Sequence, residues 1–168
     1  TGCRAYKDGL FAVPLSDTLF YPEGGRQPGD TGTLSGVRVT DTRLSGDEII
    51  HVCETELPVG QTVHGELDWE RRFRHMQCHT GEHIFSGIAH ELYGCNNVGF
   101  HLSRDCVTID FDRVLTPEQL AEVERQTNEA VFADVPTVIS YPDADTLHTL
   151  NYRSKKELTG TVRIVEGG

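Results

Sequence analysis

The chain has 168 residues, enough for one large domain or two small ones with a hydrophobic core. Its formal net charge of −11 argues against non-specific nucleic-acid binding, because attraction to phosphate drives that mode, but it leaves room for a local basic surface. The sequence has no apolar run long enough to cross a bilayer and no cleavable signal pattern, so we expect no membrane association.

The cysteines and the chain ends indicate the cellular compartment and the length of the natural polypeptide. Five cysteines, an odd number at no regular spacing, predict free thiols in a reducing cytoplasm and not a disulfide framework. The chain does not begin with Met and stops at Gly167-Gly168, so the natural polypeptide is expected to be longer. The expected location is cytoplasmic.

Residues 1–68 consist of short β-like runs separated by turns that contain Gly and Pro. Several of these runs carry apolar residues at every second position. The expected strands are Leu10–Val13, Thr33–Thr40, Ile49–Cys53 and Gln61–Leu67. Many short strands with Gly-rich turns predict a small β-barrel or sandwich.

The pattern changes to a helical one at Trp69. From about Glu70 to Tyr93, apolar residues recur at helical spacing, and Gly94 follows where a helix stop is expected. The apolar stripe comprises Phe73, Met76, Thr80, Ile84, Ile88 and Leu92. Such a helix would bury this stripe and leave its histidine face at the rim of a cleft.

The rest of the chain mixes strands with a second helix. Val98–Leu102 and Cys106–Phe111 are expected to pair as strands. Thr116–Gln119 is a capping box that opens a helix, and Thr137–Tyr141 and Thr161–Val165 are expected as closing strands. The second half is therefore predicted to be α+β, with helices packed on a mostly antiparallel sheet.

A pair of histidines on the first helix is the most informative feature. His79 and His83 are four residues apart, so they point the same way and can share one metal ion, as in zinc sites. His75 and His90 lie roughly along the same face. The alternative of surface or packing histidines is equally compatible with H-x-x-x-H alone, and the sequence shows no complete tetrahedral ligand set.

Two basic clusters are candidate nucleic-acid contacts, with solvated faces as the alternative. They are Arg71, Arg72, Arg74 and His75, and Arg153, Lys155 and Lys156.

Two ordered motifs resemble those of a known family. The segment from Phe20 to Gly32 resembles the Phe-Tyr-Pro-x-Gly-Gly-Gly-Gln signature of alanyl-tRNA synthetase editing regions and the longer AlaX proteins, with Arg26 in place of the third glycine. The segment His79-Thr80-Gly81-Glu82-His83 is similar to their H-x-x-x-H zinc motif. The resemblance covers nearly the whole chain.

The resemblance implies a fold and an activity. Residues 1–68 would be a small β-barrel of the translation-protein type, and residues 69–168 an α+β editing domain. The implied reaction is hydrolysis of the ester that joins Ser or Gly to the alanine tRNA, with tRNA as the partner. The choice between Ser and Gly stays open.

The resemblance also assigns site residues. His79 and His83 would be two of four zinc ligands, and the other two would come from a C-x-x-x-H motif beyond Gly168. Zinc could activate water or position the substrate. The residues expected near the substrate are Thr80, Asn97 and His101. Those expected to contact tRNA are Gly24, Gly25, Arg26, Gln27, Arg72 and Arg74, although the glycines could equally serve a turn that needs positive φ.

Two other functions compete with this one. The segment from His79 to His83 also fits H-x-x-E-H, the inverzincin peptidase motif, with Glu82 as general base and Glu157 as a third ligand. A peptidase would need a long substrate cleft and leaves the glycine-rich segment unexplained. A module that docks tRNA without catalysis is the third hypothesis.

Overall fold

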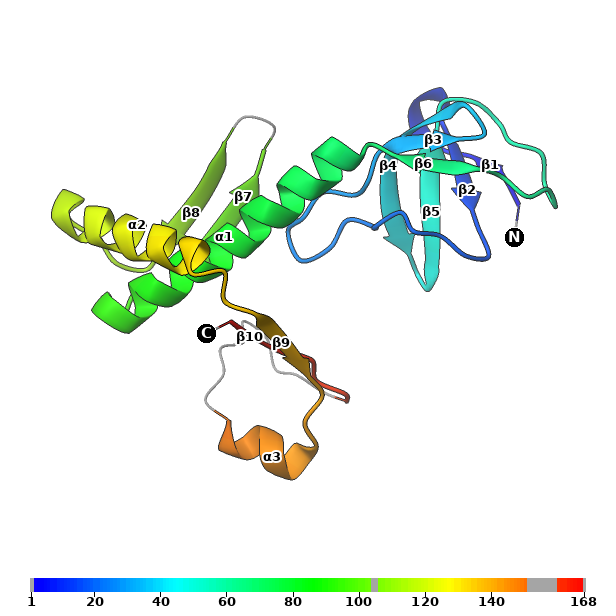
Figure 1. The fold of residues 1–168 in the computed structure, drawn as a ribbon. Coiled ribbons are helices and arrows are strands. Elements are labelled where there is room, and N and C mark those ends of the chain that lie inside the picture. The colour runs from blue at the N-terminus through cyan, green and yellow to red at the C-terminus, as the bar shows by residue number, and fades with distance from the viewer. Residues whose placement is uncertain (1, 104–105, 151–159, 168) are drawn as a thin grey trace.

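A computed structural model describes residues 2–103, 106–150 and 160–167 (Figure 1). The helices are α1 (Trp69–Tyr93), α2 (Pro117–Phe132) and α3 (Ala144–Thr149), with a short 3-10 turn, η1 (Lys7–Gly9). The strands are β1 (Arg4–Ala5), β2 (Phe11–Pro14), β3 (Gly32–Leu34), β4 (Val37–Ser45), β5 (Glu48–Cys53), β6 (Gly65–Leu67), β7 (Asn97–Leu102), β8 (Val107–Phe111), β9 (Thr137–Ser140) and β10 (Ile164–Gly167). The α+β class is therefore confirmed.

The first six strands form one antiparallel sheet in the order β1-β2-β5-β4-β3-β6. Its core includes Val13, Leu34 and Val39 from three of these strands and Phe20 from the loop that follows β2. Among the described residues, no pairing joins β1 to β6, so closure into a barrel stays a prediction.

The expected single strand Thr33–Thr40 is wrong, because the chain turns within it. Ser35 and Gly36 both have positive φ, 48° and 85°, which suits a tight hairpin turn and divides the run into β3 and β4. The other three expected strands are present, although β6 is shorter than Gln61–Leu67.

Local signals place both long helices correctly. Helix α1 begins at Trp69 and ends before Gly94, whose φ of 64° lets its N–H reach the last carbonyls of the helix. Helix α2 starts with the reciprocal capping box of Thr116 and Gln119. In the part of the chain that the structure describes, neither these helices nor α3 combine the length and apolar character that a membrane span needs.

The second half contains two separate two-stranded ladders, β7-β8 and β9-β10, among the described residues. Helix α1 packs against both α2 and β7, and the small core between them includes Ala89, Cys95 and Val123 (Figure 1). The expected one antiparallel sheet under the helices is thus present as two hydrogen-bonded pairs.

The apolar stripe of α1 faces the interior only in part: Ile84 and Ile88 are partly buried, and Ile88 packs against the core that contains Ala89. Phe73 and Met76 are 45% and 41% exposed, and the buried residues of the helix are His75, Glu82, Ser86 and Ala89. The reason lies in what packs on the helix: the loop of residues 20–31, which we call the glycine-rich loop, contacts the polar side of its first half.

The glycine-rich loop joins the N-terminal sheet to α1 through an ion pair. Arg72 donates to the carboxylate of Asp30, which is 1% exposed and also accepts the backbone N–H of Tyr21 at 2.8 Å. The Arg72 guanidinium lies over the Tyr21 ring, 5.3 Å from its centroid, and Arg71 donates to the carbonyl of Gly29 at 2.8 Å. These contacts bring the loop to the histidines of α1.

Candidate functional site

His79 and His83 face the same way on α1, as their spacing predicts. Their rings are stacked, with centroids 5.0 Å apart and an interplanar angle of 18°. The side chain of His83 is 72% exposed, whereas His79 is half-buried beneath the glycine-rich loop. The pair is therefore reachable from solvent.

Glu82 adds a third donor to this pair. Ligand atoms of His79, Glu82 and His83 all lie within 4.8 Å of one another, and the Oε2 atom of Glu82 is 3.7 Å from Nδ1 of His83. Two imidazoles and a carboxylate are a donor set that suits zinc. Sequence reasoning treated Glu82 only as a peptidase base, although a position three residues after His79 shares its helix face.

A buried network holds the Glu82 carboxylate. Its Oε1 atom accepts a hydrogen bond from Ser86 Oγ at 2.7 Å and another from the Asn97 side-chain amide. Asn97, which was expected beside the substrate, is 6% exposed and reaches this network from β7. With Oε1 engaged, Oε2 is the oxygen turned toward His83.

Gln27 orients His79 from the glycine-rich loop. Nδ1 of His79 lies 3.2 Å from Oε1 of Gln27, a buried residue. Because an amide oxygen only accepts hydrogen bonds, a neutral His79 carries its proton on Nδ1 and its lone pair on Nε2. The Phe100 ring from β7 packs on the imidazole, with the two ring centroids 5.5 Å apart. A hydrogen bond from the second ring nitrogen is the usual support of a metal-binding histidine.

The tip of the glycine-rich loop is a tight turn in contact with His79. Gly24 and Gln27 exchange two backbone hydrogen bonds of 3.1 and 2.9 Å, and both residues between them, Gly25 and Arg26, have positive φ. A Cβ atom on Gly25 would lie 3.7 Å from Cε1 of His79. Gly25 therefore both adopts the positive φ that suits glycine and lies beside the histidine pair.

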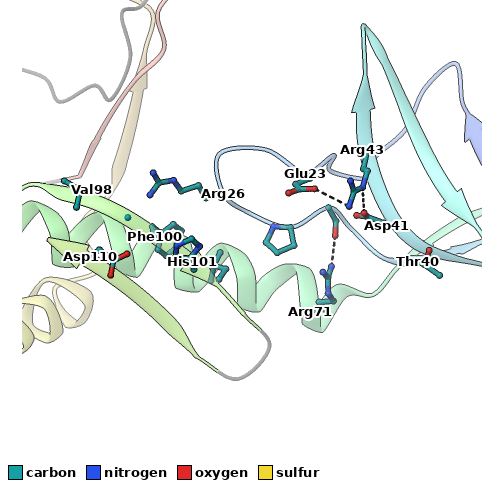
Figure 2. A pocket seen from close by; sticks show the side chains of 14 residues that line it. Glu23, Arg26, Thr40, Asp41, Arg43, Arg71, Val98, Phe100, His101 and Asp110 are labelled. Atoms are coloured by element: carbon teal, nitrogen blue, oxygen red, sulfur yellow. Dashed lines mark hydrogen bonds and ion pairs between the residues drawn. The ribbon is translucent and has the colours of Figure 1, made fainter. Parts of the chain in front are cut away.

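An open groove of about 800 Å³ lies between the glycine-rich loop and β4 on one side and the β7-β8 pair on the other (Figure 2). It is lined by Glu23, Arg26, Pro28, Gly29, Thr40, Asp41, Arg43, Arg71, Val98, Gly99, Phe100, His101, Leu102 and Asp110. The histidine pair is not part of this lining, but Phe100, which packs on His79, is. The groove thus adjoins the histidine pair.

The remaining predicted residues are dispersed. His101 faces the groove from β7, and Thr80 and Arg74 are exposed on α1. Arg72 is engaged with Asp30. Arg153, Lys155, Lys156 and Glu157 lie outside the described residues.

The other two histidines of the helix do not join the pair. His75 is buried, and burial together with the charges of Arg71 and Arg74 lowers its pKa below the ordinary value. Nδ1 of His90 lies 3.3 Å from the carbonyl oxygen of Cys95, beyond the end of α1. Within the described part of the chain, the metal-compatible group is therefore confined to His79, Glu82 and His83.

Comparison with known proteins finds several relatives that are alanyl-tRNA editing proteins. No family model matches the chain. It is 35% identical over 160 residues to the alanyl-tRNA editing protein Aarsd1 of Danio rerio, covering 93% of this chain and 39% of that protein. It is 38% identical over 147 residues to the alanyl-tRNA editing protein AlaX-L of Pyrococcus horikoshii, covering 83% of this chain and 36% of that protein.

A third relative is the alanine–tRNA ligase of Thermococcus kodakarensis, 40% identical over 129 residues, or 71% of this chain and 14% of the ligase. The chain spans less than two fifths of the length of the editing proteins that it matches. Because the similarity extends over nearly the whole chain, the chain belongs to the family of AlaX-type alanyl-tRNA editing domains.

Proposed function

We propose that this chain carries the catalytic site of a zinc-dependent deacylase that hydrolyses Ser or Gly esters of the alanine tRNA. The observation that carries the proposal is the group of His79, Glu82 and His83 beside an open groove. The relatives of this chain are alanyl-tRNA editing proteins, which supports tRNA editing as the process. Editing answers a physical limit, since a pocket for a small side chain separates near-isosteres by only roughly 1–3 kcal/mol.

His79 and His83 would hold the zinc ion, with the Glu82 carboxylate next to them. Their donor atoms are nitrogen and oxygen, which zinc accepts, and the group is open on the side of the exposed His83. When bound, zinc would polarise the ester carbonyl or lower the pKa of a bound water. From the family resemblance, a C-x-x-x-H motif would supply further ligands.

The protein residues around this group would position it and the substrate. Gln27 holds the Nδ1 side of His79, and Ser86 and Asn97 hold one oxygen of Glu82. His101 in the groove and Thr80 on α1 would offer hydrogen bonds to the aminoacyl end. The turn of Gly24 to Gln27 and the exposed Arg74 would contact the tRNA, while Arg72 would act by fixing the loop through Asp30.

The domain division belongs to the same proposal. Residues 1–68 would form the barrel-type domain that presents the glycine-rich loop, and residues 69–168 the editing domain that carries the histidines. A protein acting on tRNA charged for translation would work in the cytoplasm.

A deacylation assay tests the function. The natural full-length protein should release Ser or Gly from mischarged alanine tRNA and leave correctly charged Ala-tRNA intact. Chelation of zinc, or His79→Ala or His83→Ala, should reduce the rate by more than the roughly 10- to 100-fold typical of outer-shell partners of a metal. Binding of tRNA without any hydrolysis would instead favour a docking module.

The inverzincin alternative predicts a different result in the same preparation. A general base must reach the water that it activates, whereas Glu82 is 5% exposed and has one oxygen engaged by Ser86 and Asn97. A peptidase would lose its activity in Glu82→Gln. The deacylase should keep most of its activity in that variant once zinc is saturating.

A further inference from the structure

Arg26 occupies a backbone conformation that suits glycine. Its φ is 68°, at the second position of the two-residue turn between Gly24 and Gln27. Turns of this kind favour glycine or asparagine at that position, because at positive φ a Cβ atom crowds the backbone carbonyl, and asparagine offsets this by local hydrogen bonds. An arginine at this position strains the backbone, and strained residues cluster at functional sites, which favours a functional role for its side chain.

Among the described residues, no contact of the Arg26 side chain compensates this strain. Arg43, in the same groove, is paired with Asp41 at 2.5 Å and Glu23 at 3.7 Å, and Arg71 donates to the Gly29 carbonyl. Arg26 is exposed and makes no hydrogen bond or ion pair with the described residues. Figure 2 shows its guanidinium extending from the loop toward the β7 side of the groove, where Val98 lies.

The position of Arg26 relates it to the proposed chemistry. Its neighbour Gly25 lies close enough to His79 that an added Cβ would be 3.7 Å from Cε1 of that ring, and Phe100 and His101 line the groove next to Arg26. An RNA strand whose 3′ ester reaches the histidine pair along this groove would pass its backbone across the turn. In a chain with a net charge of −11, an uncompensated guanidinium at this place is a local attraction for phosphate.

We propose that Arg26 is a phosphate-binding residue, which takes a backbone phosphodiester of the single-stranded 3′ end of the RNA whose ester is cleaved. The planar guanidinium can donate two parallel hydrogen bonds to a phosphate. Asp110 faces the same groove from β8, and no ion pair joins it to Arg26 in the described residues. The inference rests on the proposed function and names the group of the substrate that Arg26 contacts.

Substitution to glycine separates this role from a structural one. In the natural full-length protein, Arg26→Gly relieves the strain, so its Tm should stay at or above the wild-type value. Its affinity for a short single-stranded RNA ending in CCA, with serine joined to the 3′ end by a non-hydrolysable amide, should fall about tenfold. The slope of log affinity against log salt should shrink by about 0.7, the value for one phosphate of a single strand.

Two control variants frame the result. Ser35→Gly relieves the same positive φ in the turn between β3 and β4, outside the groove, and Arg4→Gln removes a positive charge on β1. Neither should change the RNA affinity or the salt slope. Arg26→Lys should restore part of the slope because it restores the charge.

The dependence of RNA affinity on salt tests the phosphate contact of Arg26, and the cleavage assay tests the deacylase function separately. An unchanged slope in Arg26→Gly, or no measurable affinity of the wild-type protein for the RNA, overturns the phosphate contact. If the wild-type protein cleaves Ser or Gly esters while the slope is unchanged, the deacylase function stands without it. If the slope shrinks but no ester is cleaved, the phosphate contact stands and the deacylase function fails.

Discussion

Glu82 is held inside the protein by two neighbours of different origin, Ser86 one turn along α1 and Asn97 on β7. A carboxylate is normally solvated, and burying one is costly unless hydrogen bonds or a cation compensate it. Here the hydrogen bonds fix one oxygen and leave the other facing His83. These hydrogen bonds compensate the burial of a carboxylate at this position beside the two histidines.

Removing the charge of Glu82 should weaken metal binding. Glu82→Gln keeps the size of the side chain but loses the anionic oxygen, so zinc affinity should fall roughly 10- to 100-fold. Competition with a chromophoric chelator measures the change. Glu91→Gln, at an exposed position of the same helix, is the matched control and should bind zinc like the wild type. Equal affinity in Glu82→Gln and wild type would remove Glu82 from the donor set.

His51 shows the opposite use of a histidine, as a packing residue of the N-terminal sheet. Its Nδ1 lies 2.9 Å from the carbonyl oxygen of Val13, its Nε2 lies 2.8 Å from Thr18 Oγ1, and the Phe20 ring meets it edge-on. It is fully buried, and desolvation lowers its pKa below the ordinary value of 6.5. The two kinds of histidine differ in burial and in neighbours, which sequence spacing does not report.

The buried His51 makes stability depend on pH. The unfolded state takes up a proton near pH 6.5, whereas the folded state resists it, so the free energy of unfolding should fall as pH drops below 6.5 and level off beneath the folded-state pKa. Urea unfolding at several pH values between 5 and 8 measures this, with His51→Gln as the comparison. If the variant retained the whole pH dependence of the wild type, His51 would not be its source. His75, whose pKa is also lowered, should account for a remaining part.

At the scale of elements, the glycine-rich loop and α1 depend on each other. The loop reaches the helix through the buried pair of Asp30 and Arg72, and only then does Gln27 meet His79. Sequence signals fixed the start and end of α1 well, because Gly94 and the change of periodicity at Trp69 are local. They did not predict the burial of His75, Glu82 and Ser86, because that burial depends on β7 and on a loop some 40 positions earlier in the chain.

Breaking the buried ion pair should loosen this connection. Asp30→Asn leaves the Arg72 charge without its partner, and removal of one member of a buried pair costs about 3 kcal/mol or more. Chemical denaturation should report that loss. Glu122→Gln breaks the exposed pair with Arg125 on α2 and should change stability little. A similarly small effect of both substitutions would mean that the loop is held by other contacts.

At the scale of the whole molecule, the structure brings two distant motifs to one place. The turn from Gly24 to Gln27 and the helix position of His79 are separated by more than 50 residues, yet Gln27 and His79 are hydrogen-bonded. The resemblance of both motifs to one family predicted their family, which the comparisons confirm, but not the contact between them. The spacing from His79 indicates that Glu82 shares the histidine face, but the hydrogen bonds that Glu82 accepts from Ser86 and Asn97 and the burial of Asn97 could not be predicted, since they depend on how β7 packs against α1.

The central claim is that one turn of α1 presents His79 and His83, with Glu82, to a single zinc ion. Zinc K-edge anomalous diffraction from crystals of the natural full-length protein tests it most directly. The account predicts one anomalous peak bonded to a nitrogen of each histidine at about 2.0–2.1 Å. A zinc peak at another place, or well-occupied zinc bound by neither His79 nor His83, would contradict it.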